Sequence, residues 1–396
     1  MDKGIEKIEA REILDSRGTP TIEVSVHAFG SVGAFSVPSG KSKGSHEVVS
    51  LSTQDAIASV THLNDELKGF PLGDQSALDS KLMALDGTSD KSKLGGNALL
   101  GVSVAYAKVS AKLSGKEIYE YLQEISNLPS SGKVPRLYVN LINGGEHSES
   151  PLAFQEYHMV PETDSIRESL EIASRIQEEL KTLVEQEFGN IILGDEGGFV
   201  LNTSDVKKPL ELIAKAIEKA GSSLKVRLSL DVAASSFYKN GKYLVGEVEY
   251  DRDKLIDLYQ GLISKYGIFS IEDPLEEEDF EGFREFREKT KISAVGDDLT
   301  VTNPERIKKA IENKSIDAVI IKPNQIGTLT ETLEAIRVAR GNGVDCIVSH
   351  RSGETEDTFI ADLAWAFGCL GLKAGAPSQE VRKVKYERLC QIQEHK

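Results

Sequence analysis

Six short apolar stretches in the second half of the chain each end in a charged or titratable residue. These residues are Asp231, Glu272, Asp297, Lys322, His350 and Lys373. From Glu272 onward they recur at intervals of about 25 residues, the length of a strand, a loop and a helix of about three turns. In consecutive parallel βα units the carboxyl ends of the strands share one rim, where the chemistry of such folds takes place. The spacing therefore predicts that these six side chains meet.

Three of these residues are carboxylates, which repel one another on a shared rim unless a cation neutralises them. No paired Cys or His ligands accompany Asp231, Glu272 and Asp297, so the cation should be hard, and Mg²⁺ fits best. Beside that cation and Lys373, we expect the pKa of Lys322 to fall from about 10.4 toward roughly 7–8, where an amine acts as a base. Such a set suits abstraction of a proton next to a carboxylate, with the metal stabilising the enolate. The simpler alternative is that Lys322 only pairs with Asp297 or Glu272.

Three loops of small residues could complete such a site. Residues 38–44 combine serine, glycine and lysine, which is typical of an anion nest or a mobile lid but also of a plain surface turn. Residues 143–147 carry His147 after two glycines, and residues 194–198 place an acidic pair between glycines. Flanking glycines let the backbone approach a ligand closely and hold a carboxylate against it.

The elements that must carry these groups begin with an α+β region. Residues 21–28 alternate between apolar and polar, which predicts a half-buried antiparallel strand, and residues 34–37 return after a turn as a second strand. Helical spacing follows over residues 53–68, 74–85 and 98–113, with Asn97 as the expected N-cap of the third helix.

The best linker signal is the segment LPSSGKVP at residues 128–135. We therefore place a boundary between an N-terminal α+β domain, residues 1–133, and a catalytic domain, residues 134–396. Beyond the linker we expect strands at 137–142 and 154–160, helices at 164–187 and 209–220, and then the six strands that deliver the charged residues. Strands alternating with helices predict an α/β barrel or open sheet.

Composition narrows the classes of function. The chain has 396 residues, 39% of them hydrophobic and 28% charged, and a net charge of −16. That charge argues against nucleic acid as the partner. No apolar run reaches the length of a membrane span, and the N-terminus lacks the plan of a signal peptide. The three cysteines, Cys346, Cys369 and Cys390, show no metal-binding spacing, so we expect a reducing cytoplasm.

Several motifs in this order resemble the enolase family over nearly the whole chain. They are LDSRG (14–18), PT (20–21), PSG (38–40), NGG with His147 (143–147), QE (155–156), GDEGG (194–198), SIEDP (270–274), GDDLTVTN (296–303), Lys322 with residues 324–327, SHRSGETED (349–357), and Lys373 with residues 375–377. The resemblance implies an α/β fold, a modified TIM-type (β/α)8 barrel of order ββαα(βα)6 with an N-terminal α+β cap domain. It also implies one strand antiparallel to the rest, which periodicity alone does not reveal.

The resemblance further implies a hydro-lyase of glycolysis and gluconeogenesis that converts 2-phosphoglycerate reversibly to phosphoenolpyruvate. Lys322 would remove the C2 proton, and Glu196 would assist departure of the C3 hydroxyl, with Glu156 beside it. Two Mg²⁺ ions are implied in each active site, the second recruited with substrate.

The remaining implied roles concern ligands. Asp231, Glu272 and Asp297 would hold the first Mg²⁺, and Ser39 would help to hold the second. Arg351 and Ser352 would bind the phosphate, Lys373 the carboxylate, and His147, His350 and Gln155 would line the pocket. The family also implies a homodimer.

Some positions depart from the family pattern. Lys41 and Lys43 add two charges to the serine-glycine loop, where they either assist substrate capture or face solvent. Glu146 precedes His147 and could perturb its titration, and we expect residues 379–382 to steady the subunit contact. Two alternatives remain: another reaction of the same superfamily, such as a racemase or cycloisomerase, and a non-catalytic binding protein on the same scaffold.

Overall fold

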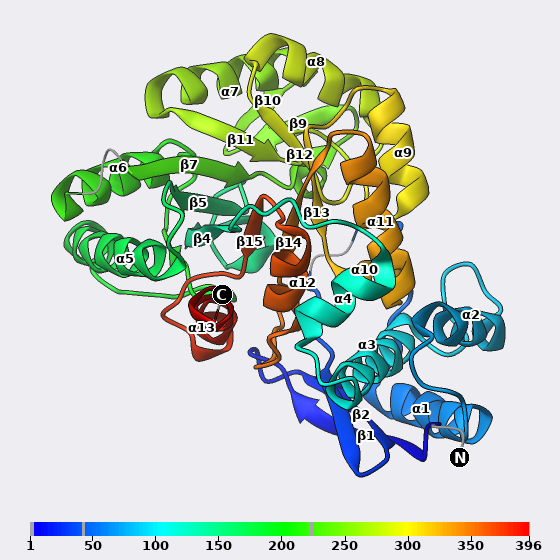
Figure 1. Cartoon of the computed structure of the whole chain (residues 1–396). Coiled ribbons are helices and arrows are strands. Elements are labelled where there is room, and N and C mark those ends of the chain that lie inside the picture. Colours follow the sequence, from blue (N-terminus) through cyan, green and yellow to red (C-terminus); the bar gives the residue numbers. More distant parts are fainter. Residues whose placement is uncertain (1–3, 42–43, 222–224, 396) are drawn as a thin grey trace.

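A computed structural model of the chain describes residues 4–41, 44–221 and 225–395 (Figure 1). Its N-terminal part is an antiparallel sheet of order β1-β2-β3 packed against helices. The elements are β1 (Lys7–Leu14), β2 (Pro20–Ala28), β3 (Ser31–Ser36), α1 (Thr53–Leu67), α2 (Gln75–Asp86), α3 (Gly96–Leu113) and α4 (Ile118–Ser126).

The expected alternation in β2 is confirmed, because Ile22, Val24 and Val26 are fully buried on one face. This face packs on α3, which approaches closely at Gly101. A Cβ atom on Gly101 would lie 2.4 Å from Cγ2 of Val24, so the glycine is what permits this helix–sheet distance.

The C-terminal part is a closed barrel of eight strands. They are β4 (Arg136–Asn143), β5 (Glu156–Pro161), β7 (Val226–Asp231), β11 (Ile268–Glu272), β12 (Ser293–Gly296), β13 (Ala318–Ile321), β14 (Asp345–Ser349) and β15 (Gly371–Lys373). Neighbours pair in this order, and β15 closes the barrel by pairing with β4. The β5 strand runs antiparallel to β4 and β7, whereas the other barrel pairs are parallel.

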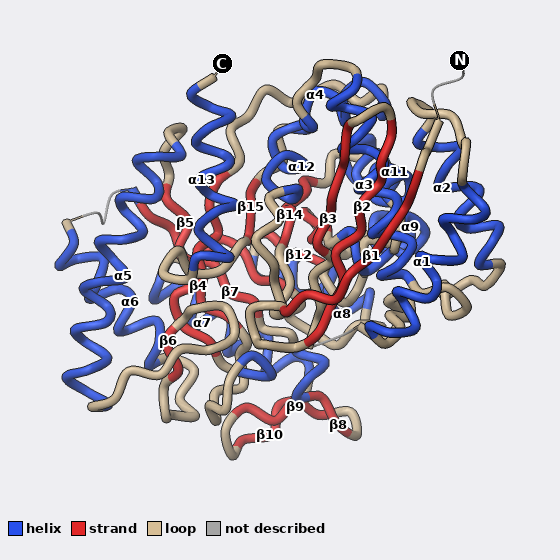
Figure 2. Tube along the Cα trace, turned by 90° about the horizontal axis from the view of Figure 1, so that it is seen from below, coloured by secondary structure: helices blue, strands red, loops and turns tan. Residues whose placement is uncertain are grey.

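Helices surround the barrel. They are α5 (Ile166–Phe188), α6 (Lys208–Ala220), α7 (Arg252–Tyr266), α8 (Phe280–Thr290), α9 (Pro304–Glu312), α11 (Leu329–Gly341), α12 (Phe359–Phe367) and α13 (Glu380–Glu394). Two strands and two helices precede the regular βα units, so the order ββαα(βα)6 is confirmed. A small ribbon of β8 (Tyr238–Lys239), β9 (Lys242–Val245) and β10 (Val248–Tyr250) projects from one end of the molecule (Figure 2).

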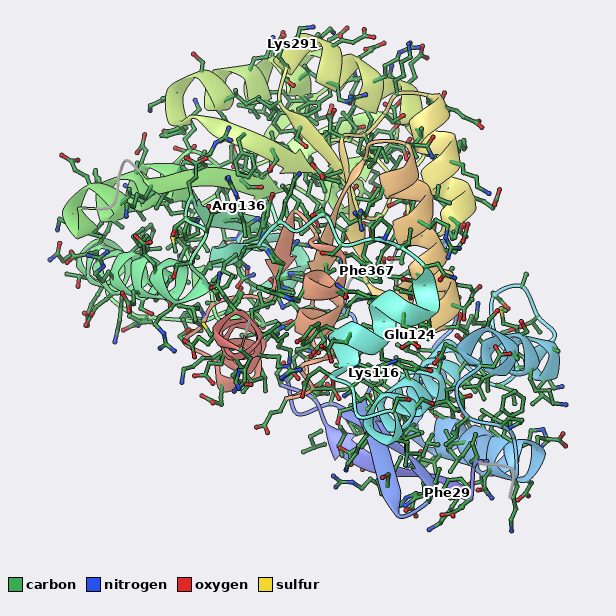
Figure 3. The ribbon with its side chains drawn as sticks, in the orientation of Figure 1. Phe29, Lys116, Glu124, Arg136, Lys291 and Phe367 are labelled. Carbon is green, nitrogen blue, oxygen red and sulfur yellow. The ribbon has the colours of Figure 1, made fainter. Side chains whose placement is uncertain are left out.

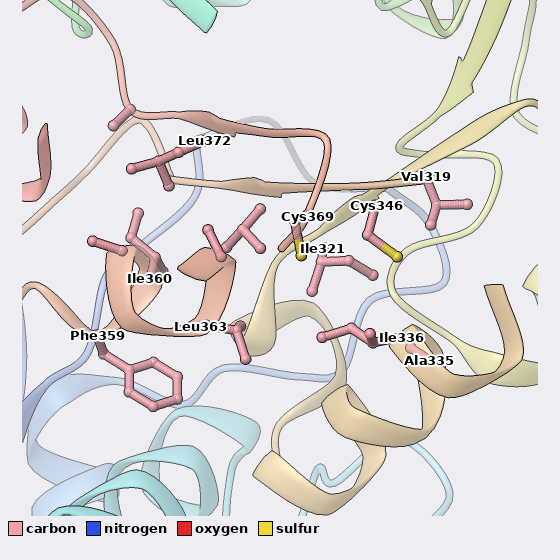
Figure 4. Packing of buried hydrophobic residues seen from close by; sticks show 14 of the residues in the cluster. Val319, Ile321, Ala335, Ile336, Cys346, Phe359, Ile360, Leu363, Cys369 and Leu372 are labelled. Atoms are coloured by element: carbon pink, nitrogen blue, oxygen red, sulfur yellow. The ribbon is translucent and has the colours of Figure 1, made fainter. Parts of the chain in front are cut away.

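The barrel wall separates two hydrophobic clusters. Val319 and Ile321 of β13 belong to the large cluster under the helices, and Figure 4 shows Ile321 near Ile336 of α11. Ala318 and Ile320 belong instead to a small cluster inside the barrel. Because side chains alternate along a strand, Lys322, two positions after Ile320, also faces the barrel axis.

The N-terminal part rests on the barrel through α4. Gln123 of this helix donates from Nε2 to the carbonyl oxygen of Ala366 in α12, at 2.6 Å. Figure 3 labels Glu124 of α4 and Phe367 of α12, the two helices that meet here. Between α4 and β4 the chain has no helix or strand, and the domain boundary after residue 133 stays a prediction.

Three details differ from the sequence-based expectations. The β1 strand was not predicted, since its outward residues are mostly charged and only Ile8 is buried. The α4 helix was also not predicted. Asn97 is not an N-cap, because α3 begins one residue earlier, and its amide instead pairs with the backbone of Leu51. In the described residues, no helix is long and apolar enough to cross a membrane.

Candidate active site

The barrel strands bring the predicted residues together at their carboxyl ends. Lys322 follows β13 in phase with Ala318 and Ile320, and Lys373 ends β15 in phase with Gly371, so both lysines face the barrel interior. The same argument applies to Asp231, Glu272 and Asp297 at the ends of β7, β11 and β12. These five strand ends therefore converge as the sequence predicts.

Lys373 lies at the centre of an acidic cluster. Its Nζ atom is 2.8 Å from Oδ2 of Asp231, 2.9 Å from Oε1 of Glu272 and 3.2 Å from Oε1 of Glu156. All four side chains are buried. Burial alone would lower the pKa of Lys373, but the three carboxylates outweigh it and raise that pKa well above its usual value. The three carboxylates therefore favour the charged form of this lysine.

Lys322 pairs with Asp297, as the simpler of the two sequence interpretations has it. Gln325 also donates from Nε2 to Oδ1 of Asp297, at 3.0 Å. Burial opposes the charged amine, but the Asp297 carboxylate outweighs it and raises the pKa of Lys322. The expected fall of this pKa is thus wrong for the arrangement in the structure, because the amine has a carboxylate partner within hydrogen-bonding distance.

The three predicted metal ligands fit a hard cation in their chemistry. Burial, together with Glu156 and Asp297, raises the pKa of Asp231 even beside Lys373. Burial and repulsion from Asp231 likewise raise the pKa of Glu272 well above its usual value. Burial and mutual repulsion thus outweigh the Lys373 ammonium at both carboxylates, and a divalent ion would add positive charge there.

The tightest potential ligand groups among the described residues are nevertheless two others. Ligand atoms of Asp273, Asp297 and Asp298 lie within 4.8 Å of one another, as do those of His147, Glu156 and Glu196. Asp231, Glu272 and Asp297 do not form such a group in the described part of the chain.

Backbone strain concentrates at the same rim. Ala233, Asp273 and Val301 are not glycines, yet they have positive φ angles of 46°, 42° and 42° after β7, β11 and β12. Asp273 then accepts the backbone N–H groups of Asp297, at 3.0 Å, and Asp298, at 2.6 Å. Strained backbone of this kind persists where surrounding contacts fix it, commonly at functional sites.

Two glutamates and two histidines form a second cluster. His147 Nδ1 lies 3.3 Å from Oε1 of Glu196 and 3.4 Å from Oε1 of Glu156. His350 Nε2 lies 3.3 Å from the same Glu196 oxygen, and Asn140 donates to the other at 2.9 Å. The two histidines come from the loops after β4 and β14, Glu196 comes from the glycine-flanked segment 194–198, and Glu156 is the first residue of β5.

The histidine–glutamate contacts set the protonation of this cluster. Burial disfavours charged His147, but Glu196 and Glu156 outweigh it and raise its pKa to about 10. Burial and Glu156 would raise the pKa of Glu196, yet His147 and His350 lower it to about 2. The proton of the pair therefore resides on His147. The suspected influence of Glu146 is not needed, since it is exposed and the two buried carboxylates account for the shift.

Arg351 and Ser352 face the serine-glycine loop. Arg351 donates from Nη1 to Glu47 Oε2 at 2.9 Å and from Nη2 to Glu47 Oε1 at 3.1 Å, and both side chains are buried. Ser352 Oγ accepts the backbone N–H of Lys41 at 2.8 Å. The half-exposed Lys41 ammonium lies 3.7 Å from Asp195. Lys43 lies outside the described residues.

The Ser39 side chain is held by two residues of the N-terminal part. Its hydroxyl donates to Asp15 Oδ2 at 2.6 Å and accepts from Arg17 Nη2 at 2.9 Å. The Ser39 backbone pairs with that of Gly353, which joins the serine-glycine loop to the segment that carries Arg351 and Ser352. The hydroxyl is thus engaged by Asp15 and Arg17, and its assignment as a metal ligand stays a prediction. The other serine of the loop, Ser42, lies outside the described residues.

A cavity of about 560 Å³ opens beside the histidine–glutamate cluster and is lined in part by Lys41, His147 and Asp195. Gln155 also reaches the rim, where its Nε2 atom donates to Asp231 Oδ2 at 3.4 Å.

Sequence reasoning missed three residues that order the site: Asn140, Glu47 and Arg382. Asn140 occupies an inward position of β4, and its apolar neighbours carried no signal for a buried amide. Glu47 follows the serine-glycine loop by three residues, so proximity to that loop was the available signal.

Two family models match the chain. The N-terminal domain model of enolase matches residues 5–122, and the enolase C-terminal TIM barrel domain model matches residues 132–396. The enolase of Methanopyrus kandleri is 44% identical over 411 residues, which cover 98% of this chain and 95% of that protein. The enolase of Thermococcus gammatolerans is 43% identical over 410 residues, which cover 98% and 94%. With this agreement between motifs, barrel and relatives, the chain belongs to the enolase family.

Proposed function

We propose that this chain is a lyase that catalyses the enolase reaction, the reversible dehydration of 2-phosphoglycerate to phosphoenolpyruvate. The observation that carries the proposal is the arrangement of the barrel mouth. A lysine with its carboxylate partner, a buried acidic cluster and a protonated histidine–glutamate cluster all converge there. Dehydration needs these three functions together: a base, a stabiliser of the enolate and a proton source for the departing hydroxyl.

Lys322 is the proposed base. Its Nζ atom takes the C2 proton of the substrate when the amine is neutral, and the Asp297 contact holds the side chain in one orientation until then. Glu196 is the proposed acid for the C3 hydroxyl. The proton that His147 holds 3.3 Å from Glu196 is the proton available for this step, and Glu156 stabilises that charge from the other side.

Mg²⁺ is the proposed cofactor, with two ions in each active site. Asp231, Glu272 and Asp297 would hold the first, and Ser39 would help to hold the second, recruited with substrate. The bound ions supply positive charge against which the carboxylate of the enolate is stabilised. The all-oxygen donor set and the raised pKa values of Asp231 and Glu272 support this choice.

The remaining groups bind substrate. Arg351 and Ser352 would hold the phosphate, Lys373 the carboxylate, and His350 and Gln155 would line the pocket. The buried position of Arg351 supports its role, since a guanidinium out of water binds a phosphate through paired hydrogen bonds.

The test measures the absorbance of phosphoenolpyruvate formed from 2-phosphoglycerate in the presence of Mg²⁺. We expect turnover by the wild type and a loss of about 10²–10⁴-fold for Lys322→Ala, the usual contribution of a positioned base. Lys91→Ala is the matched control, since Lys91 is also a buried, ion-paired lysine, but its carboxylate partner is Glu331 of α11 and not Asp297. A silent wild type, or a fully active Lys322→Ala variant, would refute the proposal.

A non-catalytic binding protein on this scaffold would not need the lysine base or the acids, and all of them are present. A racemase or cycloisomerase would not be expected to combine Glu196 with the Arg351–Ser352 pair. Neither alternative has a specific observation in its favour.

We further propose a homodimer in the cytoplasm. All three cysteines are buried and free, which is compatible with a reducing compartment. Sedimentation of the purified protein measures the subunit number directly.

A further inference from the structure

Helix α13 places one arginine inside the active-site rim. Arg382 has no solvent exposure and is the largest fully buried side chain among the described residues. Residues 379–382 were expected to steady a subunit contact, but Arg382 points into its own chain. A guanidinium buried this completely requires a full set of acceptors.

The shortest hydrogen bonds of Arg382 to carbonyl oxygens reach two different active-site segments, and longer ones reach Gln379 Oε1 at 3.4 Å and Ser16 Oγ at 3.5 Å. Nη1 donates to the carbonyl oxygen of Arg351 at 2.7 Å, and Nη2 donates to that of Ser352 at 2.8 Å. Nη2 also donates to the carbonyl oxygen of Asp195, the residue before Glu196, at 3.0 Å. One side chain thus ties the phosphate-binding candidates to the segment that carries the proposed acid.

Arg382 also contacts a titratable ring, that of His350. Nη1 of Arg382 also contacts Nδ1 of His350. Arginine keeps its protons and offers no acceptor, so Nδ1 must present a lone pair. The single proton of the neutral ring then lies on Nε2, which is 3.3 Å from Oε1 of Glu196. This tautomer directs an N–H group at the Glu196 carboxylate.

We propose that Arg382 is a positioning residue that holds His350 as the neutral Nε2–H tautomer and aligns it with Glu196. The inference rests on the proposed role of Glu196 as the acid. Burial lowers the pKa of His350 well below its usual value, and the Arg382 charge lowers it against the opposing pull of Glu196, which agrees with a neutral ring. Arg382 touches no reacting atom itself.

The fold leaves space for this guanidinium at Gly375. Gly375 has φ of 82°, and a Cβ atom there would lie 3.0 Å from Cδ of Arg382 and 2.8 Å from the carbonyl oxygen of Glu196. A side chain at this position would push the arginine or the acid segment out of place.

The first test is the ¹⁵N NMR spectrum of His350 in the wild-type protein, assigned with a His350→Gln variant. We expect an unprotonated, acceptor-type Nδ1 and a protonated Nε2 at neutral pH. A protonated Nδ1 in the wild type overturns the proposal, even if the enzyme turns over 2-phosphoglycerate. An inactive enzyme with the expected tautomer would instead overturn the proposed function.

The second test compares variants of α13. Arg382→Met removes the donor, so His350 should populate both tautomers and kcat should fall about 10–100-fold, the usual effect of losing a partner that orients a functional side chain. KM should change less than kcat, because Arg382 does not bind substrate. Arg382→Lys keeps a donor and should restore part of kcat and of the Nε2–H population. It also serves as the informative variant if Arg382→Met does not fold.

Lys385→Met is the matched control. Lys385 is buried on the same helix and bonds the carbonyl oxygens of Thr355 and Val381, without a contact to His350 among the described residues. We expect lower stability but an unchanged His350 spectrum and unchanged kcat. If Lys385→Met shifts the His350 resonances as much as Arg382→Met, then Arg382 acts only through general packing and the proposal fails.

Discussion

Glu47→Gln tests the link between the serine-glycine loop and the phosphate-binding candidate. Glu47 and Arg351 are buried, with side-chain exposures of 7% and 4%, and two hydrogen bonds join them. Removing one partner of a buried ion pair typically costs about 3–5 kcal/mol, because the other charge is left without compensation. Asn324 still accepts a hydrogen bond from Arg351 through Oδ1, at 2.9 Å, so we expect the lower end of that range.

The cost translates into a measurable change of melting temperature. Unfolding entropy scales with length, so a chain of this size loses roughly 1.2 °C for each kcal/mol. Glu47→Gln should therefore melt about 4 °C below the wild type in phosphate-free buffer. Inorganic phosphate should reverse much of this loss, because it supplies the negative charge that Arg351 has lost. At 100 times its dissociation constant it would return about 2.7 kcal/mol.

Glu331→Gln is the matched control for this experiment. Glu331 also joins the N-terminal part to the barrel, through an ion pair of 3.0 Å with Lys91, but its carboxylate pairs with this lysine and not with Arg351. This variant should lose stability without any added response to phosphate. The reasoning is refuted if Glu47→Gln melts with the wild type, or if phosphate raises both variants by the same amount.

Two further predictions concern charge in the barrel mouth. Glu272→Gln should abolish Mg²⁺-dependent turnover and the rise of melting temperature on adding Mg²⁺. The circular dichroism spectrum should stay that of the wild type. Full turnover in this variant would show that the metal ligands are assigned wrongly. The raised pKa of His147, about 10 against 6.5, means that its contribution to stability is complete below pH 6.5 and is lost as the pH rises through about 10. His147→Gln should therefore flatten the alkaline side of the stability profile, and equal pH slopes for variant and wild type in chemical denaturation would contradict this.

The barrel was predictable because its strands carry strong local signals. The run at Ala318–Ile321 is buried on both faces, so it is continuously apolar, and the charged residue after it marks the strand end. The β1 strand lacked such a signal, since one face is solvated and its sequence KIEAREIL contains four charged residues. Sequence periodicity detects what is buried, and an exposed edge strand is specified mainly by its partner, β2.

The pairing of charges in the site was much less predictable. The sequence indicates that Lys322 and Lys373 share a rim with three acids, but which amine meets which carboxylate depends on distances across the barrel. Arg382 illustrates the same limit. Helix α13 also carries Lys383, which is exposed, and Lys385, which is buried, so only the rotation of the packed helix decides which of its basic side chains enters the site.

Charge balance reconciles the expected and observed protonation of Lys322. A buried carboxylate stabilises a neighbouring ammonium, so the Asp297 contact must raise the pKa of Lys322. The expectation of a lowered pKa assumed instead that the negative charge of Asp297 is neutralised by a cation. Both statements follow from one rule, because the pKa of this amine depends on the net charge that Asp297 presents to it. On the proposed assignment, Lys322 would serve as a base where the negative charge of Asp297 is shared with a bound cation, so Asp297 would couple ion binding to the basicity of the lysine.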